Sequence, residues 1–321
     1  MLAVVHEAQS GETHTLDARE AAPASASAEY YRENPQSIRM GSHSVGVPGL
    51  VQGVWALHQR YGSMKWADLI EPAIAVAENG VEVSIWHHKM VSYAAPALEA
   101  FPETRRIQTV DGKPPPLGWL LKQKDLAQTL RAIQEKGEKA LAVGPIAAKI
   151  EAATGGVVTE LDLARYEAKW REPIRGSYSG YDLAAMPPPS SGGVLLVQML
   201  NVLQRFELTE MSPTSSEFVH LVASTMKLAF ADRAEHLGDP DYHPVPVERL
   251  TSMEYADQQA ARIRPDGQPD VPDRLSAPPD DAGTTHISII DRNGNAVALT
   301  QTINTIFGSK ITVPGTGVVL N

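Results

Sequence analysis

The residues best suited to chemistry in this sequence are threonine hydroxyls near its carboxyl-terminal end. Thr284 and Thr302 lie in two stretches, 284–290 and 296–304, in which apolar and polar residues alternate. An alternation with period two predicts β-strands that carry one polar face. A threonine hydroxyl becomes a nucleophile when a neighbouring base takes its proton. The arrangement of these strands therefore decides whether the hydroxyls can act together.

The two stretches are predicted to form a hairpin around an Asn-Gly pair at 293–294, which tolerates positive φ. Apolar side chains then face each other only if even-numbered residues pair with even-numbered residues. A three-residue loop, 292–294, with its glycine in the left-handed conformation provides this register. It places Thr302 opposite Thr284, with Asn304 two residues farther on. A two-residue loop would mix the faces and ranks second.

The segment before Thr284 decides between a structural and a catalytic interpretation. Threonine is common in strands because it is β-branched, so the alternation alone favours a structural role. Gly283, however, joins a polar, proline-containing run at 277–282 to the strand. Cleavage before Thr284 would give it a free α-amine of pKa roughly 7.7–8, which could serve as the base. Glycine also permits the backbone geometry for such a cut; otherwise Gly283 is a hinge.

The residues around the hairpin belong to a longer pattern. From Thr284 the sequence reads Thr-Thr-His-x-Ser, then Asp-x-x-Gly-Asn-Ala-Val-Ala and Thr-x-Thr-x-Asn-x-x-Phe-Gly-Ser. This pattern resembles the segment at which γ-glutamyltranspeptidases cleave themselves. Other motifs resemble the family in the same order along the chain, at residues 16–23, 46–49, 61–62, 71–80, 186–193, 229–233 and 238–241. The resemblance covers nearly the whole chain.

The resemblance implies an α+β fold, the four-layer αββα sandwich of the N-terminal-nucleophile hydrolases, incomplete in this chain. Residues 1–283 would form the large-subunit region and residues 284–321 the start of the small-subunit region, both within one αββα domain. Both subunits would come from one precursor, a zymogen. The resemblance further implies a chain truncated at both ends, with the oxyanion-hole glycines beyond its last residue.

The resemblance also assigns roles to individual residues. Cleavage between Gly283 and Thr284 would expose Thr284 as the nucleophile, which attacks the γ-glutamyl carbonyl of glutathione or a related amide. Thr302 would support the nucleophile, and Asn304 would contact the amino-acid end of the donor. Arg19 would bind its α-carboxylate, because a planar guanidinium binds carboxylates in bidentate fashion. Water or an amino acid would accept the glutamyl group, and no cofactor or metal is implied.

Two alternatives to a γ-glutamyltransferase or glutathione hydrolase stay open. One is a related N-terminal-nucleophile amidase, such as a cephalosporin (glutaryl) acylase, which would share the threonine and most motifs. The other is a noncatalytic truncated homologue that serves in binding or structure.

Composition limits the classes of function. The chain has 321 residues, 43% of them hydrophobic, and can bury a substantial core. Its formal net charge of -10 argues against nonspecific nucleic-acid binding. The absence of cysteine excludes thiol nucleophiles and disulfides. No signal peptide is visible at the start of the sequence, although the resemblance suggests a periplasmic or extracellular location.

Periodicity and punctuation predict a mixed chain. We expect a hairpin of strands near residues 2–5 and 14–17 and a strand pair at 176–185. Helices are expected at about 48–62, 66–79, 83–100, 120–135, 145–153, 194–206 and 217–234.

Other polar groups favour structural interpretations. Residues 190–193, Ser-Ser-Gly-Gly, lack the lysine of a phosphate loop, so helix capping is preferred to anion binding. His87 and His88 point in different directions on a helix, which disfavours a shared ligand site. His286 is expected to be packed and hydrogen-bonded. Turns and caps, rather than a metal site, are predicted for Asp232, His236, Asp239, Asp241 and His243.

Overall fold

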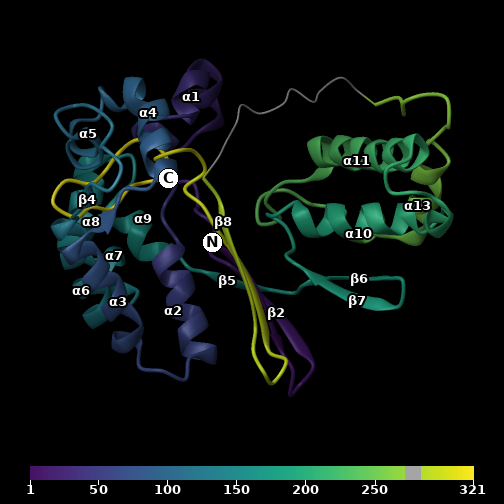
Figure 1. The fold of residues 1–321 in the computed structure, drawn as a ribbon, viewed down its shortest axis with the longest axis horizontal. Coiled ribbons are helices and arrows are strands. Elements are labelled where there is room, and N and C mark those ends of the chain that lie inside the picture. Colours follow the sequence, from purple (N-terminus) through teal and green to yellow (C-terminus); the bar gives the residue numbers. More distant parts are fainter. Residues whose placement is uncertain (272–282) are drawn as a thin grey trace.

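The computed structural model describes residues 1–271 and 283–321, and a five-stranded antiparallel sheet runs through its centre (Figure 1). The strand order is β5-β2-β1-β9-β8. The strands are β1 (Leu2–Glu7), β2 (Glu12–Asp17), β5 (Lys169–Arg171), β8 (Thr285–Ile290) and β9 (Ala296–Gln301). The polar run predicted at 277–282 lies outside the described residues.

The carboxyl-terminal hairpin has the predicted register. His286 pairs with Thr300 and Ser288 with Ala298, so even-numbered residues face even-numbered residues. The Asp291 amide donates to the Asn295 carbonyl at 2.9 Å, which leaves the three-residue loop 292–294. Its glycine has a φ of 90°, as the turn requires. The last pair of the ladder is Thr285 with Gln301, and the same register continued by one step would set Thr302 opposite Thr284.

The first and last strands of the sheet meet although almost 300 residues separate them. β1 forms the predicted hairpin with β2, and it also pairs with β9 through contacts such as Ala3 with Leu299. Since β1 is antiparallel to both neighbours, β2 and β9 run parallel to each other and end at the same edge of the sheet. The residues that follow β2 and those that follow β9 are thereby brought together.

Helices cover one side of this sheet, while β8 is an exposed outer strand. Leu16 and Ala3 pack with the partly buried Val54 and Leu57 of α2 (Leu50–Tyr61). A second core cluster joins the last ten residues of the chain to α8 (Pro145–Ala153), through contacts that include Ile150, Val313 and Leu320. On β8, Ile289 and Ile290 are 59% and 76% exposed. None of the helices in the described ranges is long and apolar enough for a membrane span.

The helices of the first half follow the sequence expectations closely. The helix predicted at 66–79 has those bounds, and α8 matches the helix predicted at 145–153. The helix predicted at 120–135 begins only at Lys124, because Leu120 and Leu121 form a short strand instead. The remaining elements here are α1 (Ala28–Glu33), η1 (Pro35–Ile38), η2 (Ser42–Ser44), α3 (Trp66–Asn79), β3 (Val81–Glu82), α4 (Ile85–Leu98), α5 (Pro102–Gln108), β4 (Leu120–Leu121), α6 (Lys124–Lys136), α7 (Lys139–Ala142) and α9 (Glu160–Arg165).

After β5 the chain builds a second group of elements, which we call the helical lobe, residues 174–271. The helical lobe and the helices α2 and α8 lie on opposite sides of the central five-stranded sheet (Figure 1). Ile174, Val194, Val197 and Leu250 form its apolar core. Its elements are β6 (Ile174–Tyr178), β7 (Tyr181–Ala185), α10 (Gly192–Leu203), η3 (Leu208–Glu210), α11 (Ser216–His236), α12 (Val247–Leu250) and α13 (Met253–Ala260).

The start of α10 offers a test of this packing with a matched control. A Cβ added to Gly193 would lie 2.2 Å from the Met186 carbonyl oxygen, whereas one added to Gly192 would lie 3.6 Å from Ser190 Oγ. Gly193→Ala should lower the free energy of unfolding by about 1–3 kcal/mol, because the backbone of residue 186 must move. Gly192→Ala should be neutral or stabilising, since alanine favours a helix.

Denaturant unfolding of both variants measures the difference. Equal midpoints for the two alanine variants would contradict the close approach of α10 to the segment after β7.

Candidate active site

The predicted substrate-binding residues meet at the edge of the sheet where β2 and β9 end. Asn304 Nδ2 donates a hydrogen bond of 3.1 Å to Glu20 Oε1, although the two residues are 284 positions apart. The same Glu20 oxygen lies 3.8 Å from Arg19 Nε. Glu20 therefore joins Arg19 to Asn304. Sequence reasoning gave Glu20 no role, and its position beside Arg19 in the motif was the only available signal.

The hydroxyl of Thr302 lies next to the predicted cleavage site. Thr302 Oγ1 accepts a hydrogen bond of 2.9 Å from the Asn304 amide. It also donates to the Gly283 carbonyl oxygen at 3.5 Å, the long limit of a hydrogen bond. This carbonyl belongs to the peptide bond between Gly283 and Thr284. Thr284 itself is exposed and directly precedes β8.

The backbone of Arg19 is held from both sides. Its amide donates to Asp17 Oδ1 at 3.0 Å, and its carbonyl accepts from the Tyr166 hydroxyl at 2.7 Å. Burial raises the pKa of Tyr166, so this hydroxyl keeps its proton and remains a donor. Because the main chain is fixed, the position of the guanidinium depends only on the side-chain torsions of Arg19.

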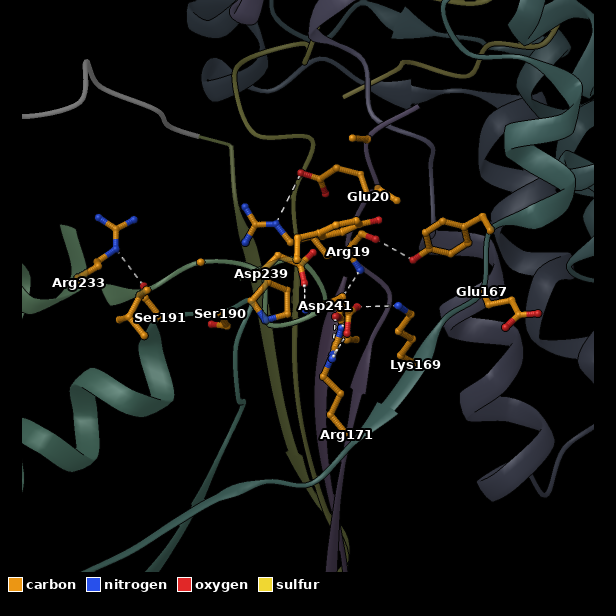
Figure 2. A pocket seen from close by; sticks show the side chains of 18 of the residues that line it. Arg19, Glu20, Glu167, Lys169, Arg171, Ser190, Ser191, Arg233, Asp239 and Asp241 are labelled. Carbon is orange, nitrogen blue, oxygen red and sulfur yellow. Dashed lines mark hydrogen bonds and ion pairs between the residues drawn. The ribbon is translucent and has the colours of Figure 1, made fainter. Parts of the chain in front are cut away.

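An ion network connects this edge of the sheet to the helical lobe (Figure 2). Arg171 on β5 donates from Nε to Asp17 Oδ2 at 2.9 Å. It also binds both oxygens of Asp241, at 3.1 and 2.8 Å, and Lys169 Nζ donates to Asp241 at 2.6 Å. The hydrogen bonds from Arg171, which have the largest effect, and from Lys169 hold the pKa of the Asp241 carboxyl well below its usual range. The loop after α11 is thus tied to the carboxylate that supports Arg19.

A cleft of about 1010 Å³ opens between this edge and the helical lobe. Figure 2 shows charged side chains from both parts around it. The described residues that line it include Arg19 and Glu20 but neither Thr284 nor Thr302. The charged lining residues are Asp17, Arg19, Glu20, Arg165, Glu167, Lys169, Arg171, Arg233, Asp239 and Asp241. The predicted carboxylate-binding residue, Arg19, therefore faces the cleft, whereas the two threonine hydroxyls are not part of its lining.

Several polar groups outside this site have structural contacts. His286 is hydrogen-bonded to Thr300 and Ser288 as expected, but it is exposed rather than packed. Ser190 Oγ accepts from the Gly192 amide at 3.4 Å, but the N-cap residue of α10 is Ser191, whose side chain makes no cap hydrogen bond, so the capping prediction is not confirmed. Ser191 instead accepts a hydrogen bond from Arg233 at 3.1 Å.

The predicted turn around Asp239 is confirmed. Asp239 Oδ1 accepts from the amide of Asp241, and its carbonyl accepts from the amides of Tyr242 and His243. In the part of the chain that the structure describes, no group of three or more His, Cys, Asp or Glu side chains is placed to hold a metal ion. His88 bonds the Pro115 carbonyl, while the neighbouring His87 contacts the ring of Phe307.

Comparison with known proteins identifies the family of the whole chain. A sequence model of the family described as gamma-glutamyltranspeptidase matches residues 1–321. The chain belongs to the gamma-glutamyltranspeptidase family. Its predicted fold, the α+β fold of the N-terminal-nucleophile hydrolases, is confirmed. The crystal structure of Helicobacter pylori gamma-glutamyltranspeptidase has the same fold. That structure has a TM-score of 0.81 and 36% sequence identity, and the match covers 84% of this chain and 79% of that one.

Curated relatives in this gamma-glutamyltranspeptidase family carry two kinds of name. The glutathione hydrolase proenzyme of Pseudomonas aeruginosa is 37% identical over 97% of this chain and 57% of its own length. The acylase ACY 1 proenzyme of Pseudomonas sp. (strain SE83) is 36% identical over 95% of this chain and 57% of its own length. The chain therefore spans little more than half the length of these relatives.

The ion network of this gamma-glutamyltranspeptidase homologue predicts a defined pH dependence. Because Arg171 and Lys169 lower the pKa of Asp241 in the folded state, the carboxylate stabilises the fold above its unfolded pKa of about 3.9. This stabilisation is lost as the pH falls further, through the folded pKa. Asp241→Asn should thus unfold more easily than the wild type at pH 7, and the difference should shrink below about pH 4.

Thermal unfolding midpoints measured across this pH range provide the test. Lys169→Met removes one donor of the network and should have a smaller effect at pH 7 than Asp241→Asn. A difference between wild type and Asp241→Asn that grows on acidification would contradict the proposed ion pairs.

Proposed function

We propose that the protein transfers or hydrolyses γ-glutamyl groups of glutathione and related amides through an acyl-enzyme on Thr284. The observation that carries the proposal is the link from Asn304 through Glu20 to Arg19, at the edge where Thr284 directly precedes β8. A carboxylate-binding guanidinium and the nucleophile's strand meet there. Membership of the gamma-glutamyltranspeptidase family supports the same reaction.

The first step would be self-cleavage between Gly283 and Thr284. The Thr284 hydroxyl attacks the Gly283 carbonyl, whose oxygen is within reach of the Thr302 hydroxyl. The acyl group of residue 283 moves from the Thr284 nitrogen to its oxygen, forming an ester, and water then hydrolyses that ester. The products are residues 1–283 as a large-subunit region and residues 284–321 as the start of a small-subunit region. The proenzyme names of relatives support this division.

In the second step the freed α-amine of Thr284 takes the proton of the Thr284 hydroxyl. The oxygen attacks the γ-glutamyl carbonyl of the donor, and the leaving amine departs with a proton. Water or an amino acid then attacks the acyl-enzyme and releases the glutamyl group. Arg19 binds the α-carboxylate of the donor, and Asn304 contacts the same amino-acid end.

The acylase names among the relatives make glutaryl amides the second candidate substrate class. A glutaryl group has the terminal carboxylate of a γ-glutamyl group but lacks its α-ammonium. Glu20 is a carboxylate 3.8 Å from Arg19 Nε, and this pairing of charges suits a zwitterionic end better than a purely anionic one. Turnover of a γ-glutamyl anilide compared with a glutaryl amide separates the two candidates.

Self-cleavage is tested by mass spectrometry of the purified full-length gene product. The wild type should yield a fragment that begins with Thr284, and Thr284→Ala should stay uncut because it lacks the nucleophile. Thr302→Val should slow the cut, since it removes the hydroxyl near the Gly283 carbonyl. A wild-type protein that stays intact and transfers no glutamyl group would instead favour a noncatalytic homologue.

The role of Arg19 predicts a change in substrate affinity. Arg19→Lys keeps the charge but loses the bidentate fork, so KM for a γ-glutamyl anilide should rise about 10- to 100-fold. Steady-state kinetics of the cleaved enzyme measures it. Arg131→Lys is the control, because Arg131 pairs with Glu78 on neighbouring helices. Equal KM values for the wild type and both variants would remove Arg19 from the site.

A further inference from the structure

The segment that carries Thr302 and Asn304 has a strained backbone. Asn304, Phe307 and Lys310 have φ values of 68°, 58° and 69°, in the left-handed region that residues other than glycine rarely adopt. A loop with three such residues within seven positions persists only if its surroundings hold it. We call this segment, residues 302–310, the site loop.

The side chain of Lys310 supplies much of that hold. The residue is only 8% exposed, and its ammonium lies inside the site loop. Lys310 Nζ donates to Thr305 Oγ1 at 2.9 Å, to the Ile306 carbonyl at 2.5 Å and to the Gly308 carbonyl at 2.8 Å. Thr305 Oγ1 in turn donates to the Gly308 carbonyl at 2.8 Å. One ammonium thus gathers three oxygens of the turn that directly follows Asn304.

The backbone of the site loop is anchored at the same end. The Lys310 amide donates to the Phe307 carbonyl at 2.8 Å. The Lys310 carbonyl accepts from the buried Thr104 hydroxyl on α5 at 2.6 Å. The Ser309 carbonyl accepts from the Gly41 amide at 2.9 Å. Lys310 therefore joins the turn to a fixed part of the protein.

The other end of the site loop bears the groups that we place in the reaction. The Asn304 amide donates to Thr302 Oγ1, and the Asn304 side chain donates to Glu20. Asn304 makes both contacts from a left-handed conformation, and the turn held by Lys310 follows it directly. Disorder in residues 305–309 would release Asn304 and the hydroxyl of Thr302 together.

We infer that Lys310 is a positioning residue, whose ammonium folds the site loop so that Asn304 and Thr302 reach the donor and the Gly283 carbonyl. This inference rests on the proposed function of the same site. A lysine suits the task because an ammonium has three donors and no acceptor, matching the three oxygens around it.

Two variants of the full-length protein test the inference. Lys310→Met keeps the length of the side chain without its donors, and Lys310→Gly also removes the backbone strain. Both should raise KM for a γ-glutamyl anilide and slow the appearance of the Thr284 fragment, each by about 10- to 100-fold, because small displacements of positioning groups cost that much. Because glycine accepts a positive φ, any defect of Lys310→Gly reflects the lost side chain and its ammonium rather than added backbone strain.

Chemical rescue provides a readout that a purely structural role would not move. None of the 321 residues is cysteine, so Lys310→Cys introduces a single thiol into this part of the protein. After unfolding, the thiolate displaces bromide from 2-bromoethylamine, and the product carries an ammonium at nearly the length of lysine. After refolding, the KM of this product for the γ-glutamyl anilide should fall back most of the way to the wild-type value. Alkylation with iodoacetamide, which adds a neutral amide, should not, and wild type taken through the same cycle is the control.

The outcomes separate this inference from the proposed function. Folded Lys310 variants with wild-type KM and cleavage rate would overturn the inference, as would a lowered melting temperature with an unchanged KM. Equal rescue by both alkylating reagents would also overturn it, because the charge would then be irrelevant. A wild type that neither cleaves itself nor turns over the donor would overturn the proposed function, and this inference with it.

Discussion

The pairing of β1 with β9 is the constraint on which the site depends. This pairing adds the carboxyl-terminal hairpin of β8 and β9 to the side of β1 that β2 does not occupy. Because every pairing in this sheet is antiparallel, β2 and β9 end at the same edge, and β8 and β5 begin there. The residues just outside these four strand ends therefore meet without any of them lying in a regular element.

A chain of polar contacts connects the residues that adjoin the strand ends at this edge. Glu20 joins Arg19 to Asn304, while Asp17 supports the Arg19 main chain and receives Arg171. Arg171 then binds Asp241 in the helical lobe. A charge in the loop after α11 thus reaches the main chain of the proposed substrate-binding arginine through two ion pairs. Of these charged groups only Asp17 is buried, and its carboxylate receives both Arg171 and the Arg19 amide.

Much of the local structure followed from the sequence. The period-two pattern and the Asn-Gly turn predicted the register of β8 and β9, since a slip by one residue would pair apolar with polar residues. Glycines marked the ends of α2 and α3. The strand at Leu120 and Leu121 was missed because its partner strand, Val81–Glu82, lies far away in the sequence. Glu20 was missed for the same reason, because Asn304 is 284 positions away. Lys310 was missed for another reason: its oxygens are nearby in the sequence but converge on the ammonium only in a loop with positive φ values.

The sequence by itself determined the family, the type of the two hairpins and of most long helices, and the candidate nucleophile at Thr284, because short-range periodicity and motif order carry that information. It did not predict β5 of the central sheet. Only the tertiary structure decided that Arg19, Glu20 and Asn304 share one edge of a sheet, that Asp241 is tied to it, and that Lys310 lies within the loop of Asn304. These contacts join distant segments or depend on left-handed backbone conformations. Neither is encoded in the spacing of neighbouring residues, since both arise from hydrogen bonds that form only when the whole sheet is assembled.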